Sequence, residues 1–288
     1  MRILFTIAHY YGQTENGFYG SLASPAKKRL QVLVNCVAAL RQHFGPKQGL
    51  TFSTERRITG ANRGRDQKIE IVVCTDGDNH LLDHLPNGLV RKRDVAGDPM
   101  LLGYGCHEVL AAEIDNYDYF CFLEDDIIIN DPEFFQKLNW FETIANEESI
   151  LQPNRFETLI GQPVDKLYID GNLGKPQFSA QFQDITIDTN LSASHLGGQL
   201  NFQRVNNPHS GCFFLNQRQM RQWMDQPYFL DRSVDFCGPL ESAATLGIMK
   251  TFKIYKPARE NASFLEVRHG DNRYLGNRMR IPQNWQPD

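Results

Sequence analysis

The sequence lacks the usual signs of a secreted, membrane-spanning or zinc-binding protein. Its 288 residues contain six cysteines, none of them in a CxxC pair. We therefore expect reduced core cysteines rather than a zinc site or a disulfide framework. No apolar run approaches the ~20 residues of a membrane span, and the start of the chain has too short an apolar run for a signal peptide. These absences predict a cytoplasmic protein without a transmembrane segment.

An excess of positive charge is also missing. The chain has 30 Lys and Arg residues against 34 Asp and Glu residues, a formal net charge of -4. A general nucleic-acid binder normally carries a strong positive field, so we expect no nucleic-acid partner. A small anionic ligand stays compatible with this balance, because one metal ion can reverse the local sign of charge.

Apolar runs and helical patterns alternate along the first half of the chain. Continuous apolar runs predict strands at 3–8, 69–77 and 119–123. Ser24-Pro25 and Asp131-Pro132 each resemble a helix cap followed by proline in the first turn. Strands that are apolar throughout, alternating with helices, favour a mainly parallel sheet covered on both faces. We predict an α/β fold of this Rossmann-like kind.

The composition changes at 152–207, which is rich in Gln, Asn, Gly and Pro. Three short strands are expected there, at 166–170, 181–188 and 199–205. Regular structure then returns with one more strand, a helix capped by Asn216, another helix and a final strand. Long irregular insertions in a compact domain are usually functional. We predict one domain over 1–288, with 152–207 as a substrate-facing insertion.

Three adjacent carboxylates, Glu124, Asp125 and Asp126, follow the apolar run that ends at Leu123. Side chains two apart in an extended chain share a face, so Glu124 and Asp126 should point the same way. Ligands of open α/β sheets bind beyond the carboxyl ends of the strands. Mg²⁺ or Mn²⁺ would relieve the repulsion among these carboxylates and would also bind substrate phosphate oxygens. Alternatively, Asp125 and Asp126 begin a turn and Glu124 pairs with an arginine.

The stretch FLEDDI resembles the Asp-x-Asp motif of GT-A-type glycosyltransferases, which use nucleotide-sugar donors. In that superfamily the motif binds a divalent metal that bridges the donor diphosphate. The resemblance implies that Glu124 and Asp126 take the two acidic positions, with Asp126 as a direct metal ligand and Asp125 beside the donor. Glutamate stands here in place of the family's first aspartate.

Three further features follow in the family's order. PHSGCFFLN resembles its Gly-containing loop beside the donor, with Gly211 as the match, although an ordinary glycine turn has the same pattern. Glu241 resembles the acidic residue at the start of a helix near the acceptor, where it would act as catalytic base; Glu in a first turn also simply compensates the helix dipole. The family's x-Glu-Asp is not intact here, so Asp235 is a nearby substitute. His269 resembles the C-terminal histidine that completes the metal shell, although a lone histidine is more often structural.

Support for the remaining candidate site residues and basic segments is weaker. In this fold the second strand ends in an acidic residue that contacts the base or ribose, which points to Asp76, although an Asp-Gly turn explains that residue equally well. Tyr10, after the first strand, would form part of the pocket for the base of the donor nucleotide. The basic run 91–93 is best explained as solvated charge. The segment 53–68 is expected to be an exposed or mobile loop whose charge is best explained as solvated; a docking surface for an anionic partner or a membrane face is the alternative. Its arginines are Arg56, Arg57, Arg63 and Arg65.

The resemblance spans most of the chain and implies metal-dependent transfer of a sugar from a nucleoside-diphosphate sugar to a hydroxyl of a glycan or other glycoconjugate. Residues 1–150 would bind the donor and 151–288 the acceptor. A sugar nucleotidyltransferase is an alternative, although 8–17 (AHYYGQTENG) lacks a Gly-rich phosphate loop. A non-catalytic, metal-stabilised module that binds glycans or proteins is another.

Overall fold

The computed structural model describes residues 1–12, 24–64, 67–161, 163–275 and 282. Arg65 and part of the loop after the first strand, from residue 13, lie outside the described residues. The α-helices are α2 (Ala26–Phe44), α3 (Leu102–Ala112), α4 (Phe134–Ile144), α5 (Gln177–Ala180), α6 (Gln217–Met224) and α7 (Pro239–Thr251). Short 3-10 helices are η1 (Ser53–Glu55), η2 (Leu82–His84), η3 (Pro99–Leu101) and η4 (Arg259–Phe264).

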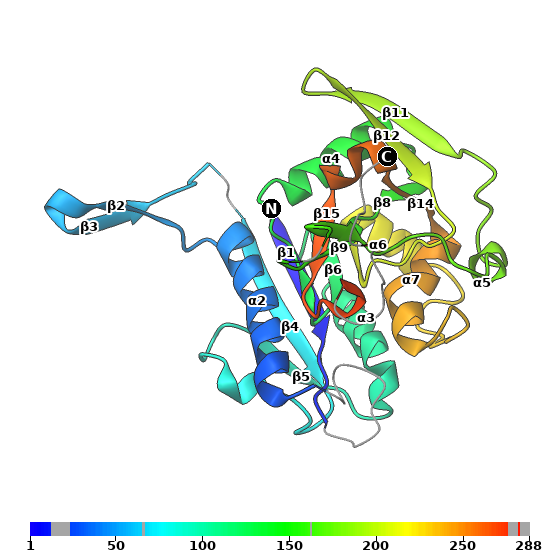
Figure 1. Cartoon of the computed structure of the whole chain (residues 1–288). Helices are drawn as coiled ribbons and strands as arrows, with labels where there is room; N and C mark the ends of the chain where they lie inside the picture. Colours follow the sequence, from blue (N-terminus) through cyan, green and yellow to red (C-terminus); the bar gives the residue numbers. More distant parts are fainter. Residues whose placement is uncertain (13–23, 65–66, 162, 276–281, 283–288) are drawn as a thin grey trace.

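A five-stranded sheet with the order β13-β6-β1-β4-β5 forms the centre of the molecule (Figure 1). Its strands are β1 (Arg2–Ala8), β4 (Lys68–Thr75), β5 (Arg91–Asp94), β6 (Tyr119–Glu124) and β13 (Cys212–Asn216). Neighbours from β6 to β5 are parallel, whereas β13 is antiparallel to β6. From β1 the chain builds the sheet outward through β4 and β5, and then returns to add β6 on the other side. The strand order therefore reverses between β1 and β6, and ligands of open α/β sheets bind at such a point.

Helices cover both faces of this sheet. Phe5 packs in one apolar cluster with Leu33 of α2 and Phe135 of α4. Its neighbour Leu4 packs in the cluster on the other face, which contains Leu110 of α3 and residues of α6 and α7. The predicted α/β fold, with a mainly parallel sheet flanked by helices, is confirmed. The prediction of core cysteines is confirmed for Cys36, Cys74, Cys106, Cys121 and Cys212, which are buried free thiols, but it is wrong for Cys237, which is an exposed free thiol.

Two four-stranded sheets complete the fold, with the orders β10-β9-β15-β7 and β11-β12-β14-β8. Their strands are β7 (Ile127–Ile128), β8 (Ser149–Leu151), β9 (Asn154–Thr158), β10 (Lys166–Tyr168), β11 (Asn190–His195), β12 (Gly198–Arg204), β14 (Lys253–Pro257) and β15 (Glu266–His269). The insertion is thus tied to the C-terminal part of the chain, because β9 pairs with β15 and β12 pairs with β14. The strand expected at 181–188 is absent, and that segment forms turns after α5.

Two helix starts differ from the sequence prediction. Pro25, rather than Ser24, occupies the N-cap position of α2, and no side chain caps that end. Helix α4 begins at Phe134, because Asp131 uses its Oδ1 to accept the backbone N–H of Glu133 and so holds a turn before the helix. The predicted cap of α6 is confirmed, since Asn216 forms a reciprocal capping box with Gln219.

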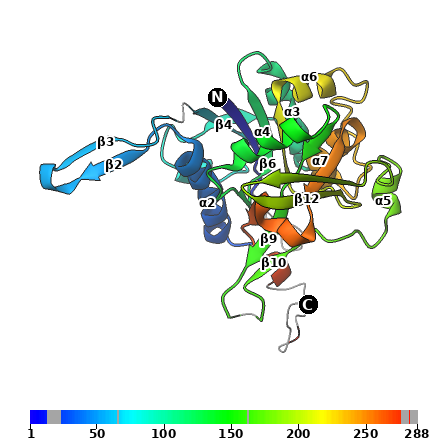
Figure 2. The same ribbon diagram turned by 90° about the horizontal axis from the view of Figure 1, so that it is seen from above.

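Residues 49–60, which include the first half of the Arg-rich segment, form an exposed β-hairpin instead of the expected loop. Strands β2 (Gly49–Phe52) and β3 (Arg57–Gly60) pair antiparallel and project from the body of the molecule (Figures 1 and 2). Arg56 adopts a left-handed φ of 52° at the turn, and the Arg57 guanidinium lies 4.4 Å from the centre of the Phe52 ring. Alternation of polar and apolar residues over four positions was too short a signal to show these strands. Among the described residues, no helix is long and apolar enough to cross a lipid bilayer.

Candidate functional site

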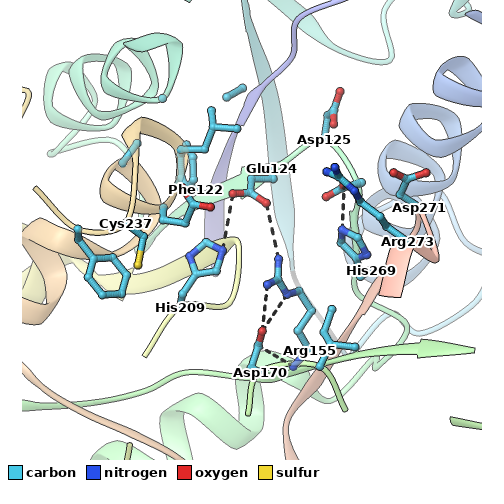
Figure 3. A pocket seen from close by; sticks show the side chains of 18 of the residues that line it. Phe122, Glu124, Asp125, Arg155, Asp170, His209, Cys237, His269, Asp271 and Arg273 are labelled. Carbon is cyan, nitrogen blue, oxygen red and sulfur yellow. Dashed lines mark hydrogen bonds and ion pairs between the residues drawn. The ribbon is translucent and has the colours of Figure 1, made fainter. Parts of the chain in front are cut away.

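A cavity of about 380 Å³ lies at the carboxyl ends of β1 and β6 (Figure 3). It is therefore at the reversal of strand order, where the fold is expected to bind ligands. Its other walls include η3 and the start of α3, strand β9, the segment after β10, the loop before β13, the first turn of α7 and the segment after β15. Six residues singled out in the sequence line it: Tyr10, Glu124, Asp125, Asp126, Glu241 and His269.

Asp126 and His269 face each other across the short β7–β15 pairing. The backbone carbonyl of Asp126 accepts the N–H of Gly270 at 2.8 Å, and His269 pairs with Ile127. This register places His269 Nε2 3.3 Å from Asp126 Oδ2. Burial opposes charge on both groups, but their mutual attraction lowers the pKa of Asp126 and raises the pKa of His269 to about 10. Without a cation the two groups form an ion pair.

Glu124 also lines the cavity, where its carboxylate lies between a histidine and an arginine. Its carboxylate is 4.0 Å from His209 Nε2 and 3.9 Å from Arg155 Nη1. Burial and the charge of Asp126 raise the pKa of Glu124 to about 8. Gly211 makes room for this side chain: a Cβ on Gly211, whose φ is +65°, would lie 2.8 Å from Glu124 Oε2. Gly211, predicted to lie beside the donor, is therefore adjacent to the acidic cluster.

Asp125 points away from Glu124 and Asp126 and is almost fully buried. Its oxygens accept hydrogen bonds from His9 Nδ1, at 2.5 Å, and from the guanidinium of Arg29 in α2. Burial raises the cost of its charge, but Arg29 and His9 lower the pKa of Asp125. His9 Nε2 accepts the N–H of Leu81, so both ring nitrogens are used. Asp125 thus ties β1, α2 and β6 together, which leaves it less available to a ligand than its neighbours.

The alternative explanation of the acidic triplet describes part of what is observed. Asp125 and Asp126 do form the turn between β6 and β7, and Glu124 does face an arginine. Neither feature accounts for Asp126 Oδ1, which is buried and has no hydrogen-bond partner among the described residues. A buried carboxylate oxygen without a partner is costly, and it suits a position that a cation occupies.

A buried charge network holds Arg155 in place. Asp170 accepts from Arg155 Nε at 3.1 Å and Nη2 at 3.0 Å, and from Lys256 Nζ at 3.1 Å. Lys256 also donates to the carbonyl of His209 at 2.7 Å. Burial works against the charge of Arg155, but Asp170 and Glu124 raise its pKa, so it stays cationic. The network presents a fixed positive charge to the cavity beside Glu124.

The remaining predicted residues divide into two groups. Glu241, in the first turn of α7, is half-buried and lines the cavity, and Tyr10 lines it after β1. Asp76 and Asp235 are absent from its wall among the described residues. Asp76 holds a turn by accepting from Asn79 Nδ2 at 3.1 Å, and exposed Asp235 accepts from Ser233 Oγ at 2.6 Å. The basic run 91–93 forms the exposed edge strand β5.

The protein alone supplies few metal ligands. Among the described residues, no group of three or more His, Cys, Asp or Glu side chains is placed to hold a metal ion. Asp126 and His269 offer two ligands, an oxygen and an imidazole nitrogen, which suit a divalent cation such as Mn²⁺. The other ligands would have to come from a substrate and from water, as is usual for Mg²⁺ at phosphate sites.

Several residues that line the cavity or stand behind its wall were not identified from the sequence. Arg155 and Glu157 stand two apart in β9 and so share a face, the face directed toward the site. The period-2 pattern was visible in NRFET, but charged residues at such spacing normally indicate the solvent face of a strand. Arg29, Asp170 and His209 gave no local signal, since their partners lie far away in the sequence.

Comparisons with known proteins give similarity only at the level of structure. No family model and no curated protein matches this chain. Mouse xyloside xylosyltransferase 1 in its apo form has 13% identity and a TM-score of 0.40, over 98% of this chain and all of that one. Mannose-1-phosphate geranyltransferase from Thermus thermophilus has 13% identity and a TM-score of 0.37, over 89% and 73%. HddC from Yersinia pseudotuberculosis has 13% and 0.36, over 89% and 90%. These values do not assign the chain to a family.

Proposed function

We propose that this protein is a metal-dependent glycosyltransferase of the GT-A type. It moves a sugar from a nucleoside-diphosphate sugar to a hydroxyl of a glycan or other glycoconjugate. One observation carries the proposal: Asp126, with a buried oxygen that lacks a partner among the described residues, faces His269 at the strand-order reversal of a parallel sheet. Glu241 lines the same cavity.

Asp126 and His269 are the residues that would hold Mn²⁺ or Mg²⁺. When bound, the ion neutralises negative charge that develops on the leaving nucleoside diphosphate. Arg155 adds a positive charge that Asp170 keeps in one orientation, which favours an anionic group in this part of the cavity. Tyr10, at the end of β1, contributes to the wall on the donor side.

Glu241 is the residue that would take the proton from the acceptor hydroxyl in an inverting reaction. Its place in the first turn of α7 puts a carboxylate on the cavity wall. Asp235 is a weaker candidate, because it is exposed and lies outside that wall. Asp125 supports the site through Arg29 and His9 and does not act on the substrate.

The test is turnover of a panel of nucleotide sugars with and without Mn²⁺. Asp126→Asn is expected to lower metal-dependent turnover by about 100-fold or more, since a bound metal contributes several kcal/mol to such steps. Asp225→Asn is the matched control, an exposed aspartate after α6 that does not line the cavity, and should stay close to wild type. Full turnover by Asp126→Asn would refute the proposal.

The products of the same assay distinguish the two alternative functions from glycosyl transfer. Release of pyrophosphate would identify a sugar nucleotidyltransferase. Binding of metal and nucleoside diphosphate without any turnover would identify a non-catalytic binding module.

A further inference from the structure

Glu157, on β9, is fully buried and stands behind the cavity wall rather than in it. Its Oε1 accepts from His269 Nδ1 at 2.7 Å and from the N–H of Tyr274 at 3.2 Å, and its Oε2 accepts from the N–H of Leu275 at 2.8 Å. The group is therefore a carboxylate that accepts from three donors.

A carboxylate in this position dictates which ring nitrogen of His269 carries a proton. An ionised carboxylate only accepts hydrogen bonds, so Nδ1 must donate to it. In the neutral imidazole the lone pair is then on Nε2, the nitrogen that lies 3.3 Å from Asp126. Metal-binding histidines commonly donate their other N–H to a carboxylate, which fixes the tautomer and raises the basicity of the ligand.

The same carboxylate also anchors the chain that follows β15. Arg273 and Tyr274 line the cavity, and the backbone of Tyr274 and Leu275 is held by Glu157. One buried group thus sets both the orientation of the His269 ring and the position of the neighbouring cavity wall.

We propose that Glu157 is a positioning residue for the cation site, which holds His269 with Nε2 directed at the ion. The inference rests on the proposed function, because it requires that Asp126 and His269 bind a cation. Glu157 touches neither the ion nor the substrate and acts through His269.

The experiment measures Mn²⁺ affinity directly, by electron paramagnetic resonance of free Mn²⁺ titrated with protein. Glu157→Gln keeps the shape but not the charge, and its amide cannot accept from all three donors. We expect it to weaken Mn²⁺ binding about 10–100-fold, the usual effect of losing such a partner. Glu266→Gln is the control: this carboxylate on β15 binds Lys166 and Tyr168 away from the cavity, and its loss should leave the affinity unchanged.

A double-mutant cycle separates positioning from general damage to the fold. If Glu157 acts through His269, Glu157→Gln should have no further effect on Mn²⁺ affinity in a His269→Ala protein. If Glu157→Gln does not fold, Glu157→Asp takes its place; it keeps the charge one methylene farther away and should weaken binding by a smaller factor.

Two results would overturn the inference alone: wild-type affinity in the Glu157 variant, or the same loss in the His269→Ala background. Absence of Mn²⁺ binding by the wild-type protein, both alone and with a nucleoside diphosphate present, would overturn the proposed cation site as well, so the two failures are distinguishable.

Discussion

Gly211 has a left-handed backbone, and a Cβ at this position would collide with Glu124. We expect Gly211→Ala to destabilise the protein and to displace that carboxylate from its place beside Arg155. Gly77 is a matched control, because its φ is +52° and a Cβ there would meet no described atom within 4 Å. Gly77→Ala should cost about 1 kcal/mol of unfolding free energy for the left-handed backbone alone. Gly211→Ala should cost at least about 1 kcal/mol more in urea denaturation; equal costs would contradict the close contact.

His107 should make the folded protein sensitive to acid. It lies in α3 among the rings of Tyr104, Phe122 and Trp223, and burial lowers its pKa to about 3. In the unfolded chain its pKa is about 6.5. Only the unfolded state therefore binds this proton between these values, and stability falls by about 1.4 kcal/mol per pH unit as the pH drops from 6.5 toward 3.

His107→Leu should remove this contribution. The slope of unfolding free energy against pH, measured by urea denaturation between pH 6 and 4.5, is expected to become shallower by about one proton. A slope in His107→Leu equal to that of wild type would show that His107 is not buried as a neutral ring.

Among the secondary-structure elements, the sequence predicted those that have a local signal, namely the buried strands and the helix with a side-chain cap. Strands β1, β4, β6 and β13 are continuous apolar runs, because both of their faces are covered by helices. The capping box of Asn216 and Gln219 is likewise a signal within a few residues of sequence. Strands β7 and β15 had no such signal, since β7 has two residues and their pairing joins positions more than a hundred residues apart. The projecting hairpin was missed because its strands bury little.

The β2–β3 hairpin should be dispensable for stability. An isolated two-stranded ribbon is marginal in water, and its base is already closed by the hydrogen bond from Ala61 N–H to the Gln48 carbonyl at 2.9 Å. Replacing residues 49–60 by an Asn-Gly turn should change Tm by less than about 2 °C, since about 1 kcal/mol corresponds to a few degrees in a protein of this size.

The β11–β12 ribbon is the matched control for that deletion. Its base is closed in the same way, by Arg204 N–H and the Thr189 carbonyl at 2.9 Å, but β12 also pairs with β14 and buries Phe202 completely. Replacing residues 190–203 by the same turn should cost at least about 3 kcal/mol, the loss of one buried Phe side chain. Similar Tm values for the two deletions would show that the projecting hairpin also packs on the body.

At the scale of the whole molecule, the cavity could be anticipated only in part. Residues at the ends of β1 and β6 were found because parallel strands deliver their carboxyl ends to one edge of the sheet. Gly211, Glu241 and His269 followed from the resemblance. Arg155 and Glu157 were missed, because their strand pattern indicates a shared face without showing whether that face meets solvent or a cavity. Asp76 and Asp235 were named from motifs alone, and the fold leaves both outside the cavity wall.

Binding of the cation and of the nucleoside diphosphate should be coupled. In the proposed function, Asp126 and His269 would provide two ligands, so the ion would need diphosphate oxygens to complete its shell, and the diphosphate would need the ion to offset the charge of Asp126. Each ligand should therefore raise the affinity of the other by the same factor. With both at about 100 times their dissociation constants, stability should rise by about 2.7 kcal/mol or more, which corresponds to about 5–10 °C in Tm.

Thermal denaturation with Mn²⁺ and a panel of nucleoside diphosphates, singly and together, measures this coupling. The shift with both ligands should exceed the sum of the separate shifts for the matching base. In Asp126→Asn the excess should vanish, and each shift is measured from that variant's own ligand-free Tm, which should itself fall because the mutation breaks the buried ion pair with His269. Asp225→Asn should keep the full excess. Strictly additive shifts in the wild-type protein would mean that the ion and the diphosphate do not share a site, since two ligands that complete one coordination shell cannot bind independently.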